Sequence, residues 1–236
     1  MIDDHYSALK KLSDNLKRPD SLYSFKISFP IIEEMLTLDN DQLEKDIREA
    51  GHAKFIYTAA ECFRTRWDMH MVYPSFMEVA DIAVDIASRN SLSKLTTQDG
   101  KPDVIPWKVK ESWGLIYGKG EHGRVHAHWP ATWAYVYCVY ACDKCSPLIF
   151  DQMIQPEHVP SYGTPVQFKP KTGQMLIFPA WLNHHVEKQE CDHDRIKLSG
   201  NIDTNFDFDK PWQHGRNMMD STYVDRKEWT TGLEFS

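Results

Sequence analysis

The chain has little positive charge and no long apolar run. Lysine and arginine number 27 against 34 aspartates and glutamates in 236 residues, which gives a formal net charge of -7 and a pI near 5.9. A field of this sign does not attract phosphate groups, so we expect no nucleic-acid partner. No apolar segment approaches the roughly 20 residues that span a bilayer, and residues 1–18 lack the apolar stretch of a secretory signal. These absences predict a cytoplasmic protein with no membrane partner.

Cysteines are few and show no disulfide rhythm. Their odd number suits a reducing compartment. Two form a lone CxxC, and the sequence offers no second CxxC or HxxxH to complete a tetrahedral zinc site. We therefore expect ordinary thiols where a strand meets a loop, with a structural metal as the alternative, and the segment CDHD reads as a solvated loop. The cysteines are Cys62, Cys138, Cys142, Cys145 and Cys191.

Hydrophobic residues make up 42% of the chain, enough to bury a substantial core, and we expect a single domain over residues 1–236. Helical signals concentrate in residues 1–100. Leucines at helical spacing mark residues 1–20, and a strand is expected in SLYSFKISFP. A second helix begins near Asp39 or Asn40 as N-cap and ends at Gly51, and a third fits PSFMEVADIAVDIASR.

After residue 100, short β-rich runs alternate with turn residues. The pattern predicts a mostly antiparallel β-sandwich or barrel in residues 101–236, supported by the helix-rich part, and hence a mainly β protein with flanking helices (α+β). The runs are VKESWGLIYG, ATWAYVYCVYA, SPLIFDQ, TPVQFKP, GQMLIFPA and RIKLSGNIDT.

Histidines gather in the segment GEHGRVHAHW. His126 and His128 are two residues apart, so in a strand both side chains point to one face and could hold one ion. Glycines on both sides of His122 indicate a turn. A second pair, His184 and His185, follows LIFPAWLN, and in a regular strand these two point to opposite faces. An isolated HxH pair is weak evidence for a metal site.

Arg195 opens the alternating run RIKLSGNI, eleven residues after His184. An unpaired guanidinium that faces a barrel interior is costly and does not stabilise the fold. An arginine in that position would need an anionic ligand.

Together these motifs resemble the bacterial and phage branch of the 2-oxoglutarate- and Fe(II)-dependent oxygenases, which share a core design with prolyl hydroxylases. The resemblance covers residues 107–203 and implies a double-stranded β-helix, or jelly-roll, core as the catalytic part. It is carried by Trp113, the turn with Gly118 and Gly120, His126-Ala-His128, Val136-Tyr137, Gly173, LIFPAWLNH ending at His184, and Arg195 with Asn201.

The resemblance implies Fe(II), 2-oxoglutarate and O2 as cofactors, with iron held by His126, His128 and His184. The opposite positions of the ion would be open to 2-oxoglutarate and dioxygen. Most of the superfamily carries an acid where this chain has His128. A neutral imidazole there leaves the ferrous centre more positive by one charge. Direct ligation by His128 is our expectation, and a role beside the ligand set is the alternative.

The same resemblance implies that Arg195 binds the distal carboxylate of 2-oxoglutarate through two hydrogen bonds. Tyr137 is either a further contact to this cosubstrate or a packed aromatic residue. Lys197 either adds a second cationic contact or faces solvent.

The implied activity is hydroxylation of a C–H bond in a peptide or protein side chain or in a small metabolite, with succinate and CO2 as coproducts. Two alternatives stay open: a cupin-type metal enzyme, either an isomerase or a dioxygenase independent of 2-oxoglutarate, and a metal-binding barrel without catalysis. The sequence leaves the primary substrate open, and also the oligomeric state, a homodimer included.

Overall fold

The structure is a computed structural model that describes residues 30–53, 58–91, 107–151 and 165–204, together with two short strands at 95–96 and 102–103. The helix expected in residues 1–20 and most of the strand expected in SLYSFKISFP lie outside the described residues.

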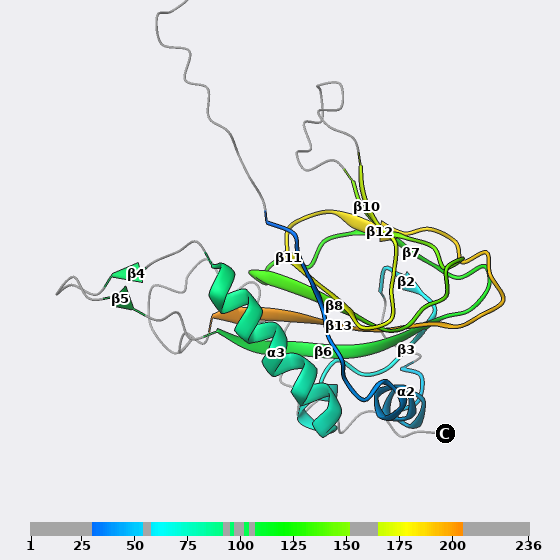
Figure 1. The fold of residues 1–236 in the computed structure, drawn as a ribbon, viewed down its shortest axis with the longest axis horizontal. Coiled ribbons are helices and arrows are strands. Elements are labelled where there is room, and N and C mark those ends of the chain that lie inside the picture. Colours follow the sequence, from blue (N-terminus) through cyan, green and yellow to red (C-terminus); the bar gives the residue numbers. More distant parts are fainter. Residues whose placement is uncertain are drawn as a thin grey trace, which may run out of the picture.

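Two antiparallel sheets form the body of the molecule (Figure 1). The larger sheet has the order β1-β11-β8-β13-β6-β3, with strands Ile32–Met35, Gln174–Pro179, Trp133–Tyr140, Arg195–Thr204, Trp107–Tyr117 and Phe63–Arg64. The smaller sheet has the order β10-β9-β12-β7-β2, with strands Val166–Phe168, Leu148–Phe150, His184–Val186, His122–His126 and Ala60–Glu61. A separate pair joins β4 (Leu95–Thr96) to β5 (Pro102–Asp103). The prediction of a mainly antiparallel β fold with flanking helices is confirmed.

Two of the predicted helices form where the sequence signals place them. Helix α2 spans Asn40–Glu49, and the side chain of Asp39 accepts a hydrogen bond from the backbone N–H of Gln42 at 3.0 Å. This N-cap satisfies one of the donors that a helix start leaves unpaired. Helix α3 spans Pro74–Asn90, with proline in its first turn, and the short 3-10 helix η1 (Met69–Met71) precedes it.

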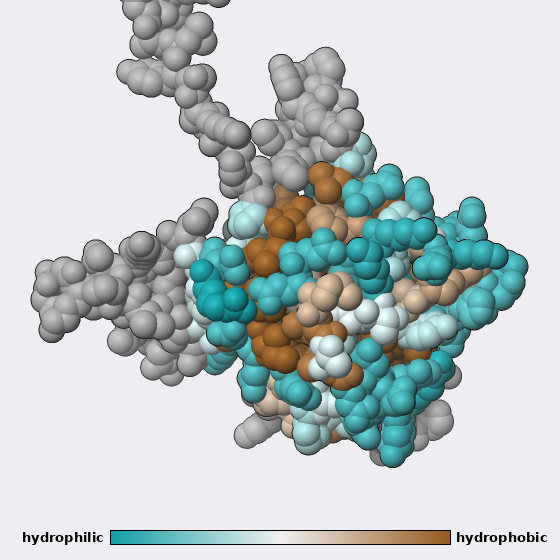
Figure 2. Space-filling view, in the orientation of Figure 1, coloured by the Kyte–Doolittle hydropathy of each residue, from teal (hydrophilic) through white to brown (hydrophobic). Residues whose placement is uncertain are grey.

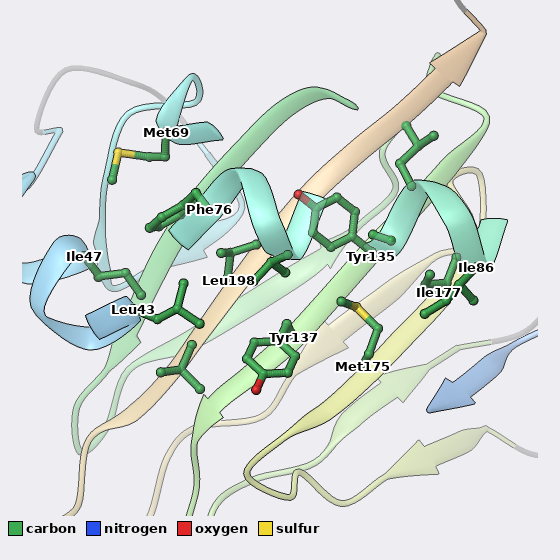
Figure 3. Packing of buried hydrophobic residues seen from close by; sticks show 14 of the residues in the cluster. Leu43, Ile47, Met69, Phe76, Ile86, Tyr135, Tyr137, Met175, Ile177 and Leu198 are labelled. Atoms are coloured by element: carbon green, nitrogen blue, oxygen red, sulfur yellow. The ribbon is translucent and has the colours of Figure 1, made fainter. Parts of the chain in front are cut away.

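Both α-helices pack on the outer face of the six-stranded sheet (Figures 1 and 3). Because side chains alternate along a strand, Tyr135 and Tyr137 of β8 and Leu198 of β13 point toward the helices. There they meet Leu43 of α2 and Phe76 of α3, both buried. The hydrophobic face of α3 thereby closes one side of the sheet.

The other face of the larger sheet points toward the smaller sheet. A second hydrophobic cluster fills much of this space and includes Trp113, Val136 and Phe178. On β13 the residues that face inward are polar and buried: Arg195, Lys197, Ser199 and Asn201. Burial of polar side chains is costly unless they have partners. These four consecutive inward positions on β13 therefore indicate a site for polar ligands between the two sheets.

Gly173 makes the turn before β11 in a conformation that favours glycine, with φ of +87°. Its N–H donates to the carbonyl of Cys138 at 2.8 Å, and its own carbonyl accepts from the N–H of Leu36 at 2.8 Å. A Cβ atom at this position would lie 2.5 Å from the carbonyl oxygen of Leu36. The turn therefore joins β8, β11 and the chain after β1 closely enough to exclude a side chain.

Hydrophilic residues cover much of the face seen in Figure 2, and hydrophobic residues emerge there in separate patches. None of the helices in the described ranges is both long and apolar enough to cross a lipid bilayer.

Candidate metal centre

Three histidines from distant parts of the chain meet between the two sheets. His126 ends β7, His184 begins β12, and the antiparallel pairing of these strands sets the two residues directly opposite each other. His128 follows two residues after His126. One ring nitrogen from each histidine can be chosen so that all three lie within 4.8 Å of one another. The structure therefore brings together the three residues expected to bind metal.

The hydrogen bonds of the three rings fix which nitrogen carries the proton. Nδ1 of His126 lies 2.7 Å from the carbonyl oxygen of Arg124, and Nδ1 of His184 lies 2.9 Å from that of Leu182. Carbonyl oxygens only accept, so both Nδ1 atoms are the protonated donors. In a neutral imidazole the lone pair is then on Nε2, which is free to bind a metal ion.

His128 is oriented in the same way by a side chain. Its Nδ1 lies 2.6 Å from Oδ1 of Asn201, and Nδ2 of Asn201 donates to Oε2 of Glu111 at 2.7 Å. The carboxylate accepts only, which fixes the orientation of the amide and presents its oxygen to the imidazole. Such outer contacts raise the basicity of a histidine ligand and hold its ring in place.

The Nε2 atoms of His128 and His184 face each other at 3.2 Å. With both protons on Nδ1, two lone pairs point at one another, an arrangement that a cation would relieve. Two ligands at 90° around an ion, with bonds of about 2.1 Å, stand about 3 Å apart. The spacing of these two nitrogens therefore suits adjacent positions on one metal ion.

Burial keeps the three imidazoles neutral. It lowers the pKa of His128 to about 3, with His126 adding to the effect, and lowers the pKa of His184 well below its ordinary value. The pKa of His126 is lowered for the same first reason, removal from water. Trp113 stacks on His128 with ring centres 5.6 Å apart and contributes to this dry environment. Neutral, unprotonated nitrogens are what a divalent ion requires.

A cavity of about 390 Å³ opens beside the histidines. Its walls come from both sheets, and its mouth includes Trp129, whose exposed fraction is 69%. The described lining residues include Thr58, Trp67, Glu111, Trp113, Leu115, Tyr117, Trp129, Val136, Lys197, Ser199 and Asn201 besides the three histidines.

Lys197 is the buried cation on the wall of this cavity. It is 5% exposed, and its ammonium lies 5.0 Å from the ring centre of Tyr117. Burial, with the charge of Arg195 as the next cause, lowers the pKa of Lys197 to about 7. A buried ammonium that gives up its charge so readily gains from an anionic partner.

Arg195 lies deeper and does not line the histidine cavity. Its Nη1 donates to the carbonyl oxygen of Ser146 at 2.6 Å, and it borders a narrow space shared with Lys197. In the described part of the chain its Nε has no hydrogen-bond acceptor. Of the two cations expected to contact the cosubstrate, Arg195 and Lys197, only Lys197 lines the histidines' cavity.

Tyr137 is not brought to the cavity. Its hydroxyl donates to Oδ1 of Asn40 at 2.7 Å, on the helix-covered side of the sheet (Figure 3). Because side chains alternate along β8, Val136 takes the position that faces the cavity. Tyr137 therefore fits the alternative of a packed aromatic residue, on the face of the sheet away from the cavity.

Two other described histidines, His185 and His122, lie apart from the cluster, as expected. His185 lies 2.7 Å from a carboxylate oxygen of Asp151 through Nδ1. His122 begins β7, where a turn was expected, and its Nε2 is 3.7 Å from Oε2 of Glu61. No motif in the sequence singles out Glu111, which β6 pairs with Asn201 across the sheet.

A family model described as "Putative 2OG-Fe(II) oxygenase" matches residues 111–201, a span that contains the three histidines and both buried cations. Over these residues the chain is similar to the 2-oxoglutarate- and Fe(II)-dependent oxygenases. A comparison with curated proteins found no match.

Solved structures with a similar fold include one crystallised with iron and two prolyl hydroxylases. HygX from Streptomyces hygroscopicus, crystallised with iron, is 11% identical, with 75% of this chain and 82% of that chain covered and a TM-score of 0.52. A viral collagen prolyl hydroxylase from Paramecium Bursaria Chlorella virus-1 is 11% identical, with 78% and 97% covered and a TM-score of 0.52. A Pseudomonas putida prolyl-4-hydroxylase is 11% identical, with 75% and 93% covered and a TM-score of 0.50. These similarities confirm the fold predicted for the core, a double-stranded β-helix.

Proposed function

We propose that this protein is an Fe(II)- and 2-oxoglutarate-dependent dioxygenase that hydroxylates a C–H bond of a peptide or protein side chain or of a small metabolite. The observation that supports this most strongly is the group of three ring nitrogens, one from each of His126, His128 and His184, that lie within 4.8 Å of one another. Each ring is held by an oxygen that accepts from Nδ1. Metal ligands need this arrangement, and buried structural histidines do not.

The donor set fits ferrous iron. Three imidazole nitrogens on one side of an ion leave its other positions free, which is the arrangement of non-haem Fe(II) oxygenases. HygX, which shares the fold, was crystallised with iron and with nickel and 2-oxoglutarate. When bound, iron with 2-oxoglutarate supplies the activation of dioxygen, and 2-oxoglutarate is oxidised to succinate and CO2.

His128 would serve as a direct ligand in place of the usual acid. Its Nδ1 is hydrogen-bonded to Asn201, which in turn is held by the carboxylate of Glu111. The negative charge of Glu111 thus lies behind two residues, His128 and Asn201, whereas a ligand carboxylate would contact the ion directly. The polarised imidazole is a stronger donor than an unsupported one, and this offsets part of the lost charge.

The distal carboxylate of 2-oxoglutarate would be held by Lys197, with Arg195 behind it. Lys197 borders both the histidine cavity and the narrow space that Arg195 shares. The unpartnered Nε of Arg195 offers a further donor. Pairing with a carboxylate restores the charge of Lys197, since an opposite charge nearby favours the ionised form.

Trp113, Tyr117 and Val136 would exclude water from the reacting centre, because they line the cavity and are buried. Exclusion of water strengthens the charge interactions inside such a site. The substrate would enter past the exposed Trp129. Two solved structures with the same fold are prolyl hydroxylases, which supports a peptide side chain as the first substrate class to examine.

Succinate formation from 2-oxoglutarate, with Fe(II) and oxygen present, tests the proposal without a known primary substrate. We expect slow turnover in the wild type, none in His184→Ala, and none without oxygen. His185→Ala is the matched control, because this neighbouring histidine binds Asp151 and not the cluster. Iron binding without succinate would favour a metal-binding barrel or a cupin-type enzyme and would overturn the proposal.

A further inference from the structure

A second cluster of metal-binding side chains lies away from the histidines. Cys142 and Cys145 lie in the turn after β8, and Cys191 lies between β12 and β13, 46 residues after Cys145. Their three sulfur atoms are 3.6, 3.6 and 3.8 Å apart. Cys191 is buried, so the solvated loop expected for CDHD is wrong at this residue. The partner that the CxxC lacks in the sequence is supplied by the fold.

These distances agree with a tetrahedral zinc site. Zinc–sulfur bonds of about 2.3 Å at tetrahedral angles place two sulfur atoms about 3.8 Å apart. A disulfide would need about 2.05 Å between two of the sulfurs. The three cysteines therefore stand as one triangular face of a tetrahedron, which pairwise disulfide bonding would not produce.

The hydrogen bonds around the cluster point to thiolates. Nε2 of Gln189 donates to the sulfurs of Cys145 and Cys191 at 3.1 and 2.8 Å, and Gln189 is 1% exposed. The amide cannot be reversed, because its oxygen accepts the N–H of Ser146 at 3.0 Å. The backbone N–H of Cys142 donates to Cys145 sulfur at 3.3 Å. Donors directed at several sulfurs stabilise negative charge on them, as a metal-bound set requires.

We propose that Cys142, Cys145 and Cys191 bind a structural zinc ion. Among the described residues no other cysteine, histidine or acidic side chain joins this group. Three ligands thus come from the described residues, and a water molecule can supply the fourth. Zinc is favoured over harder ions because thiolate ligands select soft and borderline metals.

The ion would hold together two segments that position Arg195. The carbonyl of Ser146, the residue after Cys145, accepts the hydrogen bond from Arg195, and Cys191 stands four residues before Arg195. Ser146 is also tied to the other segment, because its hydroxyl donates to the carbonyl of Lys188 at 2.8 Å. A role of zinc in 2-oxoglutarate binding rests on the proposed function. The zinc site itself is independent of that function.

Metal content and cobalt spectra test the site directly. The protein is expressed without a histidine tag, purified without chelator, and its zinc measured per chain. We expect one zinc in the wild type and in His184→Ala, which lacks a histidine ligand, and none in Cys142→Ser or Cys191→Ser. Cys62→Ala is the matched thiol control and should retain zinc, because this cysteine lies outside the cluster.

Cobalt distinguishes the two clusters, since only thiolate ligands give sulfur-to-cobalt charge-transfer absorption. We expect this absorption in the wild type and in His184→Ala, and its loss in both cysteine variants. If the variants fail to fold, the wild type can be treated with a thiol-specific mercurial. Release of zinc by this reagent would show that cysteine thiolates bind the ion. Reduced wild type with neither zinc nor the cobalt absorption overturns the proposal, and so does an absorption that survives both serine substitutions.

The proposed function can fail separately. A zinc-loaded wild type that forms no succinate would overturn the dioxygenase activity and leave the zinc site standing. Protein that forms succinate but holds no zinc would do the reverse. A disulfide between two of the three cysteines, found by alkylation and mass spectrometry in freshly purified protein, also contradicts the zinc site.

Discussion

Replacing Lys197 with methionine should stabilise the protein while removing cosubstrate binding. The lysine is buried beside Arg195, and this lowers its pKa from 10.5 to about 7. Such a change corresponds to a penalty of about 5 kcal/mol for holding the charged lysine inside the folded protein. Methionine has a similar length and no charge, so the penalty disappears in the variant.

The sign of the pH dependence follows from proton binding. Between the folded pKa and the unfolded pKa, the folded protein binds fewer protons than the unfolded chain. Stability of the wild type therefore rises with pH across that window, and the full penalty applies below it. The advantage of Lys197→Met over wild type should shrink by about 2 kcal/mol from about pH 6.5 to about pH 9.

Urea unfolding at the two pH values, without added iron or 2-oxoglutarate, measures this difference. Lys171→Met is the control, because Lys171 is exposed and should show no such trend. If the free energy of unfolding changes with pH in the same way for wild type and Lys197→Met, the reasoning is refuted. Lys197 would then have the same pKa in the folded and the unfolded protein. Binding of 2-oxoglutarate to Lys197→Met should weaken at least tenfold, measured by calorimetry with the metal site loaded.

Three other substitutions probe separate parts of the site and the fold. Arg195→Ala should raise the concentration of 2-oxoglutarate required for turnover far more than it alters iron affinity, and unchanged cosubstrate affinity would remove Arg195 from the site. Asn201→Ala should lower metal affinity about 10- to 100-fold by releasing the ring of His128 from its oxygen acceptor, measured by metal titration; Ser199→Ala, a neighbouring inward position, is the control, and equal affinities would contradict the orienting role. Gly173→Ala should lower the free energy of unfolding by roughly 1–3 kcal/mol, because a positive φ and the nearby Leu36 carbonyl both oppose a Cβ atom; an unchanged urea midpoint would contradict this.

The sequence predicts the long elements because their signals are local. Helix α2 is preceded by the N-cap Asp39 and followed within two residues by Gly51, and β8 and β13 are long enough to show the alternation of a strand. Strands β2 and β3 have two residues each and exist only through pairing with longer neighbours. No local pattern marks them.

Site residues are harder to predict, because each depends on which face of a strand is inside. Tyr137 was expected at the cosubstrate, and its neighbour Val136 occupies the inward position, since a shift of one residue exchanges the faces. Cys191 and Glu111 depend on pairing across the fold, with Cys145 and Asn201 respectively. The histidine motif succeeded because spacing and family resemblance agree on the same residues.

Two of the histidines stand on neighbouring strands in direct register, and this gives a bound ion a mechanical role. Strand β12 has three residues, and its pairing with β7 shifts immediately after His184. An ion shared by His126 and His184 would act as a cross-strand staple over this weak pairing. Amide hydrogens of β7 and β12 should then exchange with solvent more slowly in the metal-loaded protein, and those of β13 should change little. A bound metal ion would therefore stabilise the pairing of β7 with β12, in addition to its role in the reaction.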